Sequence, residues 1–260
     1  MFTETGREPS GPGPGAAEVL AGFLFPSRCL ACRRRPLRRL FRGGVCEDCW
    51  RAVALPPAAR CAVCDETTDE TVPVCGRCLL APPPFAGLRG AAPYRGAARE
   101  IVLAFKFRGA DYLARRLAAQ MCRRLPLPAG VREVTAVPAT RRARRASDHA
   151  AELLGAAVAS AVRLPFAPGR LEKVRETERQ SRLPLSRREG NVRGAFRVRG
   201  ICRGPVLLVD DVVTSGATAR ECAGRLRAAG AASISVWCFA RASRGDVDLE
   251  PVEGEPVDGR

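Results

Sequence analysis

Eight of the twelve cysteines fall into four Cys-x-x-Cys pairs, a spacing that lets two thiolates bind the same metal ion. The pairs are Cys29/Cys32, Cys46/Cys49, Cys61/Cys64 and Cys75/Cys78. Two pairs supply the four sulfur ligands of a tetrahedral zinc site, so the sequence predicts two structural zinc ions. We expect the pairs to combine in chain order, although a crossed combination stays open. Redox chemistry is the weaker alternative, because a thioredoxin-type site needs one pair and not four.

Several other chemistries are excluded by composition. The remaining four cysteines stand singly, and the N-terminus lacks the basic start and long apolar stretch of a secretory signal, so no disulfide framework is expected. The chain has one histidine, His149, which excludes a histidine-rich metal site. A Ser-His-Asp triad would have to use that residue. On its expected helix, His149 is more readily a solvated or locally bonded residue than a catalyst.

The second chemical signal is an apolar run followed by two acids and a hydroxyl-rich loop. It reads Val206-Leu207-Leu208-Val209-Asp210-Asp211-Val212-Val213-Thr214-Ser215-Gly216-Ala217-Thr218. The first four residues predict a buried strand, and the acids stand at its carboxyl end, where open α/β sheets bind ligands. The N–H groups of the loop and of the following helix N-terminus predict an anion site. Carboxylates can bind sugar hydroxyls or a hydrated magnesium ion. An acidic pair beside a phosphate site therefore fits a ribose 5-phosphate.

Two alternatives to this interpretation are disfavoured. The apolar run and acids would also fit a Walker B strand of an ATPase, but a Walker A loop needs Gly-Lys followed by Ser or Thr. Neither Lys106 nor Lys173 stands in that context, so a P-loop ATPase or helicase is excluded for this chain. A purely structural strand with capping acids is disfavoured by the two adjacent acids at its end.

Alternating strands and helices from residue 86 to 243 must position this motif. The expected strands lie at 134–137, 206–209 and 234–239, and the expected helices lie at 111–125, 148–162 and 217–229. The stretch 101–107 leads into the first of these helices, and Gly230 is a natural cap for the last. Repeated strand-helix-strand order predicts an α/β fold, a parallel sheet with helices on both faces.

The chain of 260 residues suits one medium domain and a small module. We expect a disordered tail at 1–17, a double zinc ribbon at 18–81 and the α/β domain at 86–243. An acidic disordered tail follows at 245–260. A linker is expected at Pro82-Pro83-Pro84 between the two modules.

The formal net charge of +16 is weak evidence for a nucleic-acid partner. Only two of the 43 basic residues are lysines, and this skew towards arginine is typical of a GC-rich coding bias. The longest early apolar run, 19–25, is far too short to span a bilayer. We expect a cytoplasmic protein without a transmembrane segment.

The run 206–218 resembles the phosphoribosyl pyrophosphate (PRPP) motif of type I phosphoribosyltransferases. Together with the cysteine pairs it resembles the ComF family, which joins an N-terminal double zinc ribbon to a phosphoribosyltransferase domain. Further matching positions are Tyr94, Lys106, Gly109, Val137, Pro138, Arg141, Arg145, Arg175, Thr177, Gln180, Arg188, Asn191 and Phe196. The resemblance spans residues 20–241. It departs from the family at 146–149, where Ala-Ser-Asp-His replaces the usual Gly-Phe-Asn-Gln.

The resemblance implies a site for PRPP with magnesium. The residues implied to hold the 5-phosphate are Thr214, Ser215, Gly216, Ala217 and Thr218. Asp210 and Asp211 would orient the ribose hydroxyls and, through water, magnesium, while Arg141 would cradle pyrophosphate. Lys106 would contact pyrophosphate or simply be exposed. A mobile loop at 172–194, which carries Arg175 and Arg188, would cover the site.

Two functions are compatible with these residues. The first is an enzyme that transfers phosphoribosyl from PRPP to an acceptor, which the sequence does not identify. The second is a non-catalytic accessory protein of natural competence that binds single-stranded DNA, with a competence DNA-import helicase as a further partner. Aromatic residues make up only 5% of the chain, which is few for stacking on bases.

Overall fold

The computed structural model describes residues 28–35, 44–139, 149–178 and 183–243. The tails expected at 1–17 and 245–260 lie outside these ranges. Within them, no helix has both the length and the apolar character needed to cross a membrane.

Four parallel strands form the centre of the molecule. Their order across the sheet is β1 (Gly87–Pro93), β6 (Ala231–Arg241), β5 (Gly204–Val213) and β2 (Glu133–Ala136). The two central strands are apolar and buried along most of their length, as expected for a sheet covered on both faces.

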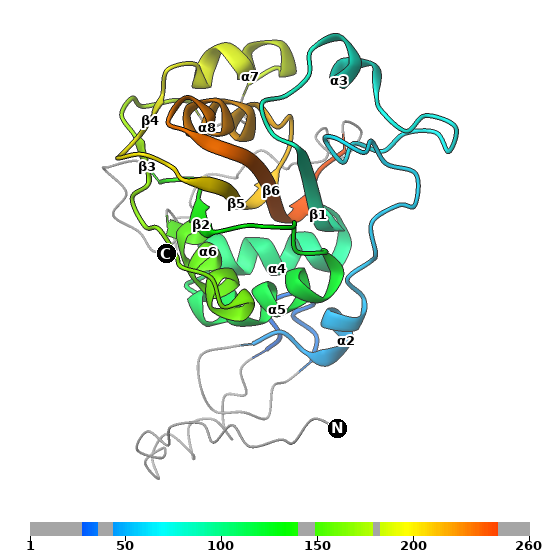
Figure 1. Cartoon of the computed structure of the whole chain (residues 1–260). Coiled ribbons are helices and arrows are strands. Elements are labelled where there is room, and N and C mark those ends of the chain that lie inside the picture. The colour runs from blue at the N-terminus through cyan, green and yellow to red at the C-terminus, as the bar shows by residue number, and fades with distance from the viewer. Residues whose placement is uncertain (1–27, 36–43, 140–148, 179–182, 244–260) are drawn as a thin grey trace, which may run out of the picture.

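Helices cover both faces of this sheet (Figure 1). On one face lie α4 (Gly96–Phe107), α5 (Ala114–Arg124) and α6 (Ala150–Val162), with the 3-10 turn η1 (Asp111–Leu113) before α5. On the other face lie α7 (Leu185–Val192) and α8 (Ala217–Ala228). The predicted α/β architecture is therefore confirmed.

Several expected elements differ from the structure at their ends, and strand β1 and helices α4 and α7 were not among the expected elements. The strand expected at 206–209 continues to Val213, so the two acids lie inside β5 rather than beyond it. The stretch 101–107 belongs to a separate helix, α4, and is not the approach to the next one. Helix α8 ends as predicted, with Gly230 in the left-handed region at φ 99°.

An excursion between α6 and β5 lies over the α8 face of the sheet. It contains the antiparallel pair β3 (Leu171–Lys173) and β4 (Phe196–Val198), with α7 between them. Helix α7 packs against α8. The loop expected at 172–194 thus contains a strand and a helix, and its residues 179–182 lie outside the described part.

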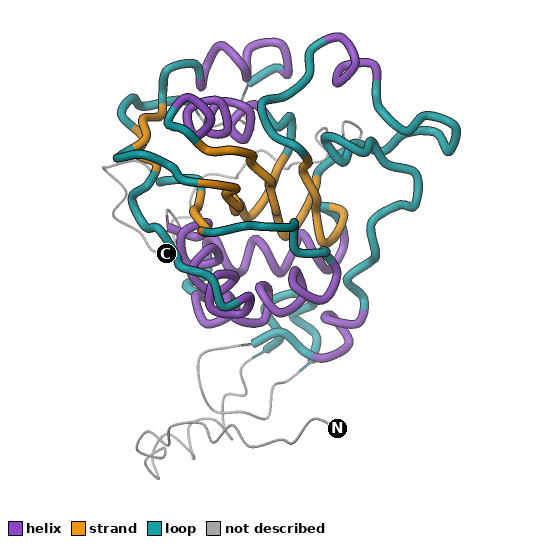
Figure 2. Tube along the Cα trace, viewed as in Figure 1, coloured by secondary structure: helices purple, strands orange, loops and turns teal. Residues whose placement is uncertain are grey.

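The cysteine-rich segment runs along the β1 edge of the sheet from one face to the other (Figure 1). Its helix α2 (Glu47–Arg51) lies on the side of α4 and α5, and α3 (Gly76–Leu80) lies near α8 on the opposite side. Figure 2 shows that loops and turns connect the two helices. The segment is therefore packed along the α/β domain, and Leu88 N donates to Val63 O at 2.8 Å directly across the boundary.

Candidate functional site

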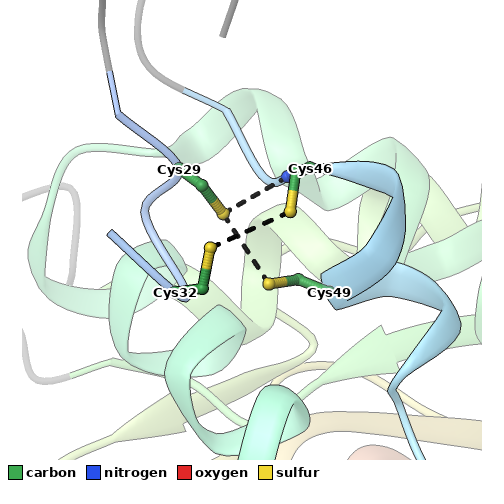
Figure 3. Close-up of side chains that lie close together, drawn as sticks. All are labelled: Cys29, Cys32, Cys46 and Cys49. Carbon is green, nitrogen blue, oxygen red and sulfur yellow. Dashed lines mark hydrogen bonds between the residues drawn. The ribbon is translucent and has the colours of Figure 1, made fainter. Parts of the chain in front are cut away.

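The first four cysteines bring their thiols together beside α2 (Figure 3). Cys29 Sγ lies 3.8 Å from Cys49 Sγ, and Cys32 Sγ lies 4.0 Å from Cys46 Sγ. Sulfur atoms at the corners of a tetrahedron around zinc, with Zn–S bonds of about 2.3 Å, lie about 3.8 Å apart. The donor set and its spacing therefore suit a structural zinc ion.

The next four cysteines form a second cluster beside α3. Cys64 Sγ and Cys75 Sγ are 3.6 Å apart. Three backbone N–H groups, from Val63, Cys64 and Cys75, point to Cys61 Sγ at 3.3–3.5 Å. The thiols thus group in chain order, as expected, and the chain carries two four-cysteine sites consistent with two zinc ions.

Each cluster contains a thiol that ionises easily and one that does not. Hydrogen bonds from backbone N–H groups, first that of Arg35, lower the pKa of Cys32 to about 6. Burial raises the pKa of Cys61, but N–H groups outweigh it and bring that pKa down to about 6. Burial holds the pKa of Cys49 and of Cys78 well above the ordinary value. A cation among the thiols would supply the charge that these buried sulfurs need to ionise.

The first cluster is attached to the α4–α5 face. The Arg116 guanidinium lies over the Trp50 ring, 4.6 Å from its centroid, and pairs with Glu47 at 2.7 Å. Arg108 donates to the carbonyl oxygen of Leu30, next to the first cysteine. These contacts hold the cluster against helices on the face opposite α8.

The two acids of β5 lie next to Lys106 of α4. Lys106 Nζ is 2.8 Å from Asp211 Oδ1, and the side chains are 28% and 7% exposed. Burial lowers the pKa of Lys106, but the carboxylates of Asp211 and Asp210 outweigh it and leave that pKa raised. Lys106 is thus a partner of the acidic pair, and not simply an exposed residue.

Asp210 has no cation of its own at this distance among the described side chains. Burial, and then the charge of Asp211, raises its pKa to about 8. Neighbouring residues of a strand point to opposite faces. Asp211 meets α4, while the charge of Asp210 acts on the thiol of Cys222 in α8. The acidic pair therefore straddles the sheet close to the loop that follows it.

The loop after β5 has the geometry of an anion site. Gly216 adopts φ 76°, a left-handed conformation that suits glycine, and is the N-cap of α8. The N–H groups of the first turn of α8 have no carbonyl partner within the helix and face this loop. Ser215 Oγ accepts from Ala217 N at 3.3 Å. Thr218, in that first turn, is the last of the residues expected to hold the 5-phosphate.

Arg188 of α7 reaches this loop from the covering excursion. Its guanidinium is buried, donates to Leu183 O at 2.9 Å and lies 3.3 Å from Thr214 Oγ1. Arg175 is placed differently, because it is exposed and donates to Asn191 O and Arg193 O at 2.8 Å. The structure therefore brings Arg188 to the loop and directs Arg175 to carbonyls of its own segment.

The remaining candidates are Arg141 and His149. Arg141, with Arg142 and Arg145, falls outside the described residues. His149 lies 3.3 Å from Glu152 at the start of α6, a local interaction.

Two arginines at the loop were not singled out from the sequence. Arg241, at the end of β6, donates to the carbonyl oxygens of Val213 and Thr214, and Arg77 of α3 donates to that of Ser215 at 3.0 Å. One signal for Arg241 was available, because it is a lone charge that closes the apolar run 236–240. Arg77 carried a weaker signal, its place between Cys75 and Cys78.

Comparison with known proteins finds similarity in both the cysteine-rich segment and the rest of the chain. Residues 20–79 match the family described as double zinc ribbon domain. Among solved structures, a glutamine PRPP amidotransferase from B. subtilis is 21% identical and covers 64% of this chain and 30% of its own, with a TM-score of 0.32. An adenine phosphoribosyltransferase from Thermoanaerobacter pseudethanolicus is 17% identical over 54% of this chain and 72% of its own, also with a TM-score of 0.32.

The matches to three curated relatives cover nearly the whole length of those proteins. DNA utilization protein YhgH of Salmonella typhi is 33% identical, and that of Escherichia coli K12 is 30% identical, each covering 84% of this chain and 99% of its own. Competence protein F of Haemophilus influenzae is 27% identical with the same coverage. The chain carries the zinc-ribbon segment and the α/β domain in one packed unit, and it belongs to the ComF family of DNA utilization and competence proteins.

Proposed function

We propose that this protein binds a phosphoribosyl ligand, PRPP with magnesium, at the end of β5 and the start of α8. The observation that carries the proposal is the succession of an acidic pair, Asp210 and Asp211, and a left-handed Gly216 at a helix N-terminus. The loop 214–218 offers N–H groups and hydroxyls to a 5-phosphate. The acids lie near the end of the preceding strand, β5, where ribose hydroxyls attached to that phosphate would fall.

Magnesium fits this site only together with its ligand. Carboxylates are ligands that magnesium prefers, but it usually keeps waters and binds substrate phosphates as well. Asp211 is already paired with Lys106, which leaves Asp210 as the available carboxylate. Among the described residues, the clusters of three or more potential metal ligands are the two cysteine sites. Oxygens of the ribose and pyrophosphate would therefore complete the shell, so magnesium and PRPP should bind together.

The reaction that this arrangement would serve is phosphoribosyl transfer. An acceptor forms a bond to ribose C1 while the bond from C1 to the pyrophosphate oxygen breaks, and pyrophosphate leaves with the electron pair. The transition state has oxocarbenium character, so positioning and charge stabilisation suffice and no covalent nucleophile is needed. Lys106, through its ammonium, and Arg141, which follows β2 in the sequence, are the proposed pyrophosphate contacts.

Binding of single-stranded DNA is a second candidate function. The names of the relatives, DNA utilization protein and competence protein, favour it. A chain of net charge +16 would attract phosphates, and a site for phosphoribose units could take a nucleotide of DNA. In this role the protein would act in the cytoplasm beside a competence DNA-import helicase.

A titration series separates these functions. The zinc-loaded protein is titrated with PRPP with and without magnesium, and with ribose 5-phosphate. The PRPP proposal predicts saturable binding of both ligands. It also predicts that PRPP binding requires magnesium and that ribose 5-phosphate binding does not. A labelled oligonucleotide is then bound at increasing salt and challenged with PRPP. A steep salt slope with no displacement by PRPP and no PRPP binding would support the DNA function and contradict the enzyme function.

A further inference from the structure

Arg241 connects the loop 214–218, named the phosphate loop below after the ligand proposed for it, to the second cysteine cluster. It ends β6, beside Val213 of β5, and is 7% exposed. Its Nη1 donates to Val213 O at 3.2 Å and to the carbonyl oxygen of Thr214. On the other side, Nε donates to Cys64 O at 3.2 Å and Nη2 pairs with Glu66 Oε2 at 2.8 Å. One buried guanidinium thus makes hydrogen bonds both to the loop and to the segment 64–66, which contains a cysteine of the second cluster.

Arginines on both sides of this boundary add to the connection. Arg77, between two ligands of the second cluster, donates to Ser215 O at 3.0 Å. Arg220, in the first turn of α8, donates to Ala81 O at 3.0 Å and approaches Cys78 Sγ at 4.0 Å. A small crevice lies here, lined by residues of both sides, among them Cys64, Cys75, Ser215 and Gly216.

The hydrogen bonds to the loop also fix the direction of its N–H groups. A peptide unit is planar, and in the trans form its carbonyl oxygen and N–H hydrogen point to opposite sides. Arg241 holds the carbonyl of Thr214, which directs the N–H of Ser215 away from the cluster. Arg77 holds the carbonyl of Ser215, which does the same for the N–H of Gly216. These are donors on which the proposed phosphate would depend.

Tight packing leaves Arg241 little room to move. A Cβ placed on Gly90 of β1 would lie 2.8 Å from Arg241 Cβ and 3.2 Å from its backbone N. Asp65, next to Cys64, accepts from Gly90 N at 2.8 Å and pairs with Arg60 at 2.6 Å. The second cluster, β1 and the end of β6 therefore pack as one block behind the loop.

The first cluster has no such connection among the described contacts. Its neighbours are α4 and α5, through Arg108 and Arg116, on the opposite face of the sheet. Loss of metal there would leave Arg241 and its partners in place. The two clusters are therefore not equivalent with respect to the phosphate loop.

We infer that the second cysteine cluster positions the phosphate loop, with Arg241 and Arg77 as positioning residues, so that metal binding at this cluster and phosphoribosyl binding strengthen each other. The coupling of cluster to loop stands on the contacts above. Its effect on ligand binding rests on the proposed function. Because coupling between two sites is reciprocal, a bound phosphoribosyl ligand must also raise the affinity of the second cluster for its metal.

The first test measures zinc release to a chromophoric chelator with and without saturating ribose 5-phosphate. We expect two zinc ions per chain. One of them should be released at least about fivefold more slowly with ribose 5-phosphate than without it. A Cys32→Ser variant identifies the phase of the first cluster, which should be unaffected by ligand. Arg241→Lys keeps the charge but cannot bridge, so it should remove the slowing. Arg77→Gln, at a side chain 32% exposed, should reduce it and is the second variant should Arg241→Lys unfold.

Arg89→Gln is the matched control. Arg89 donates to Ala62 O at 2.8 Å, and so connects β1 to the same cysteine segment without contacting the phosphate loop. It should leave the slowing unchanged. Equal release rates with and without bound ribose 5-phosphate would overturn the inference while leaving the proposed function intact.

A second test needs no ligand. Amide hydrogen exchange of residues 213–217 should be faster in Cys75→Ser than in wild type, and unchanged in Cys46→Ser. If no phosphoribosyl ligand binds the wild type, the proposed function fails, and this exchange result alone decides the coupling of cluster to loop. Equal exchange in the two cysteine variants would overturn it.

Discussion

Lys106 Nζ lies 2.8 Å from Asp211 Oδ1, which joins helix α4 to the acidic pair of the central strand β5. The two residues are 105 positions apart, and Asp211 is almost fully buried in the packed sheet. The ammonium pairs with Asp211, while burial and then the charge of Asp211 raise the pKa of the other acid, Asp210, to about 8. The chemistry proposed for the site starts from this asymmetry.

Removing the Lys106 ammonium should destabilise the fold. Lys106→Met leaves a buried Asp211 carboxylate without its cation, at a cost of about 1–3 kcal/mol. Urea denaturation of the wild type, Lys106→Met, Asp211→Asn and the double variant measures the coupling. We expect the double variant to be more stable than the sum of the single losses. Strict additivity would contradict a direct ion pair.

The pKa of Asp210 predicts how stability depends on pH. Its folded value of about 8 lies above the value of about 3.9 of an unfolded chain, so between these pH values the folded state binds the extra proton. The contribution of Asp210 to stability should therefore fall as pH rises from about 4 to about 8. Asp210→Asn should remove this part of the pH dependence of the unfolding free energy, as measured by denaturation curves at a series of pH values. An unchanged slope in the variant would contradict the raised pKa.

Magnesium-dependent PRPP binding should also depend on Asp210 ionisation. A protonated carboxyl is a poor magnesium ligand, so affinity should rise between about pH 7 and about pH 9 and binding should release a proton. Calorimetry in buffers of different ionisation enthalpy counts that proton. Asp210→Asn should bind PRPP more weakly and release fewer protons per bound PRPP, because only the titration of PRPP itself remains. Equal proton release in both proteins would contradict this role.

The left-handed Gly216 should be required for the loop. Gly216→Ala meets open space, with the nearest atom 4.0 Å away, so its cost of about 1–2 kcal/mol comes from φ alone. Ribose 5-phosphate should bind on the order of tenfold more weakly. Gly224→Ala, in the same helix with ordinary contacts, should bind normally and be stabilised by about 0.5–1 kcal/mol. Equal binding by both variants would contradict the loop geometry.

Metal analysis should find two zinc ions per chain, because the thiols form two separate tetrahedral donor sets. Cys46→Ser and Cys75→Ser should each lose one ion and lower the melting temperature, because zinc binding supplies folding free energy. Elemental analysis of the purified protein measures the ratio. One ion per chain in the wild type would contradict the grouping of the thiols.

The features predicted correctly from the sequence are those written in local patterns. The cysteine spacings define both clusters, and the apolar run with its acids and glycine defines β5, the loop and α8. Local pattern also explains one omission, because β1 reads Gly-Leu-Arg-Gly-Ala-Ala-Pro and lacks the β-branched residues that mark a strand. It is a strand because its small residues fit between β6 and the cysteine segment, where Gly90 leaves space for Arg241.

The long-range partners could not be predicted in the same way. Arg241 is one of 41 arginines, and only the register of β6 against β5 brings it to the phosphate loop. Lys106 stood out as one of two lysines, but its pairing with Asp211 depends on how α4 packs beneath the sheet. The attachment of the second cluster to the loop likewise follows from tertiary packing across the β1 edge.

The most direct test of the central proposal is calorimetric titration of the zinc-loaded protein with PRPP and magnesium. The matched variants are Asp210→Asn/Asp211→Asn and, as a control on the same face as the loop, Arg225→Gln, whose charge pairs locally with Glu221. We predict saturable binding by the wild type and the control, and its loss in the double variant. No binding by the wild type, or equal binding by the double variant, would contradict a phosphoribosyl site at the acidic pair.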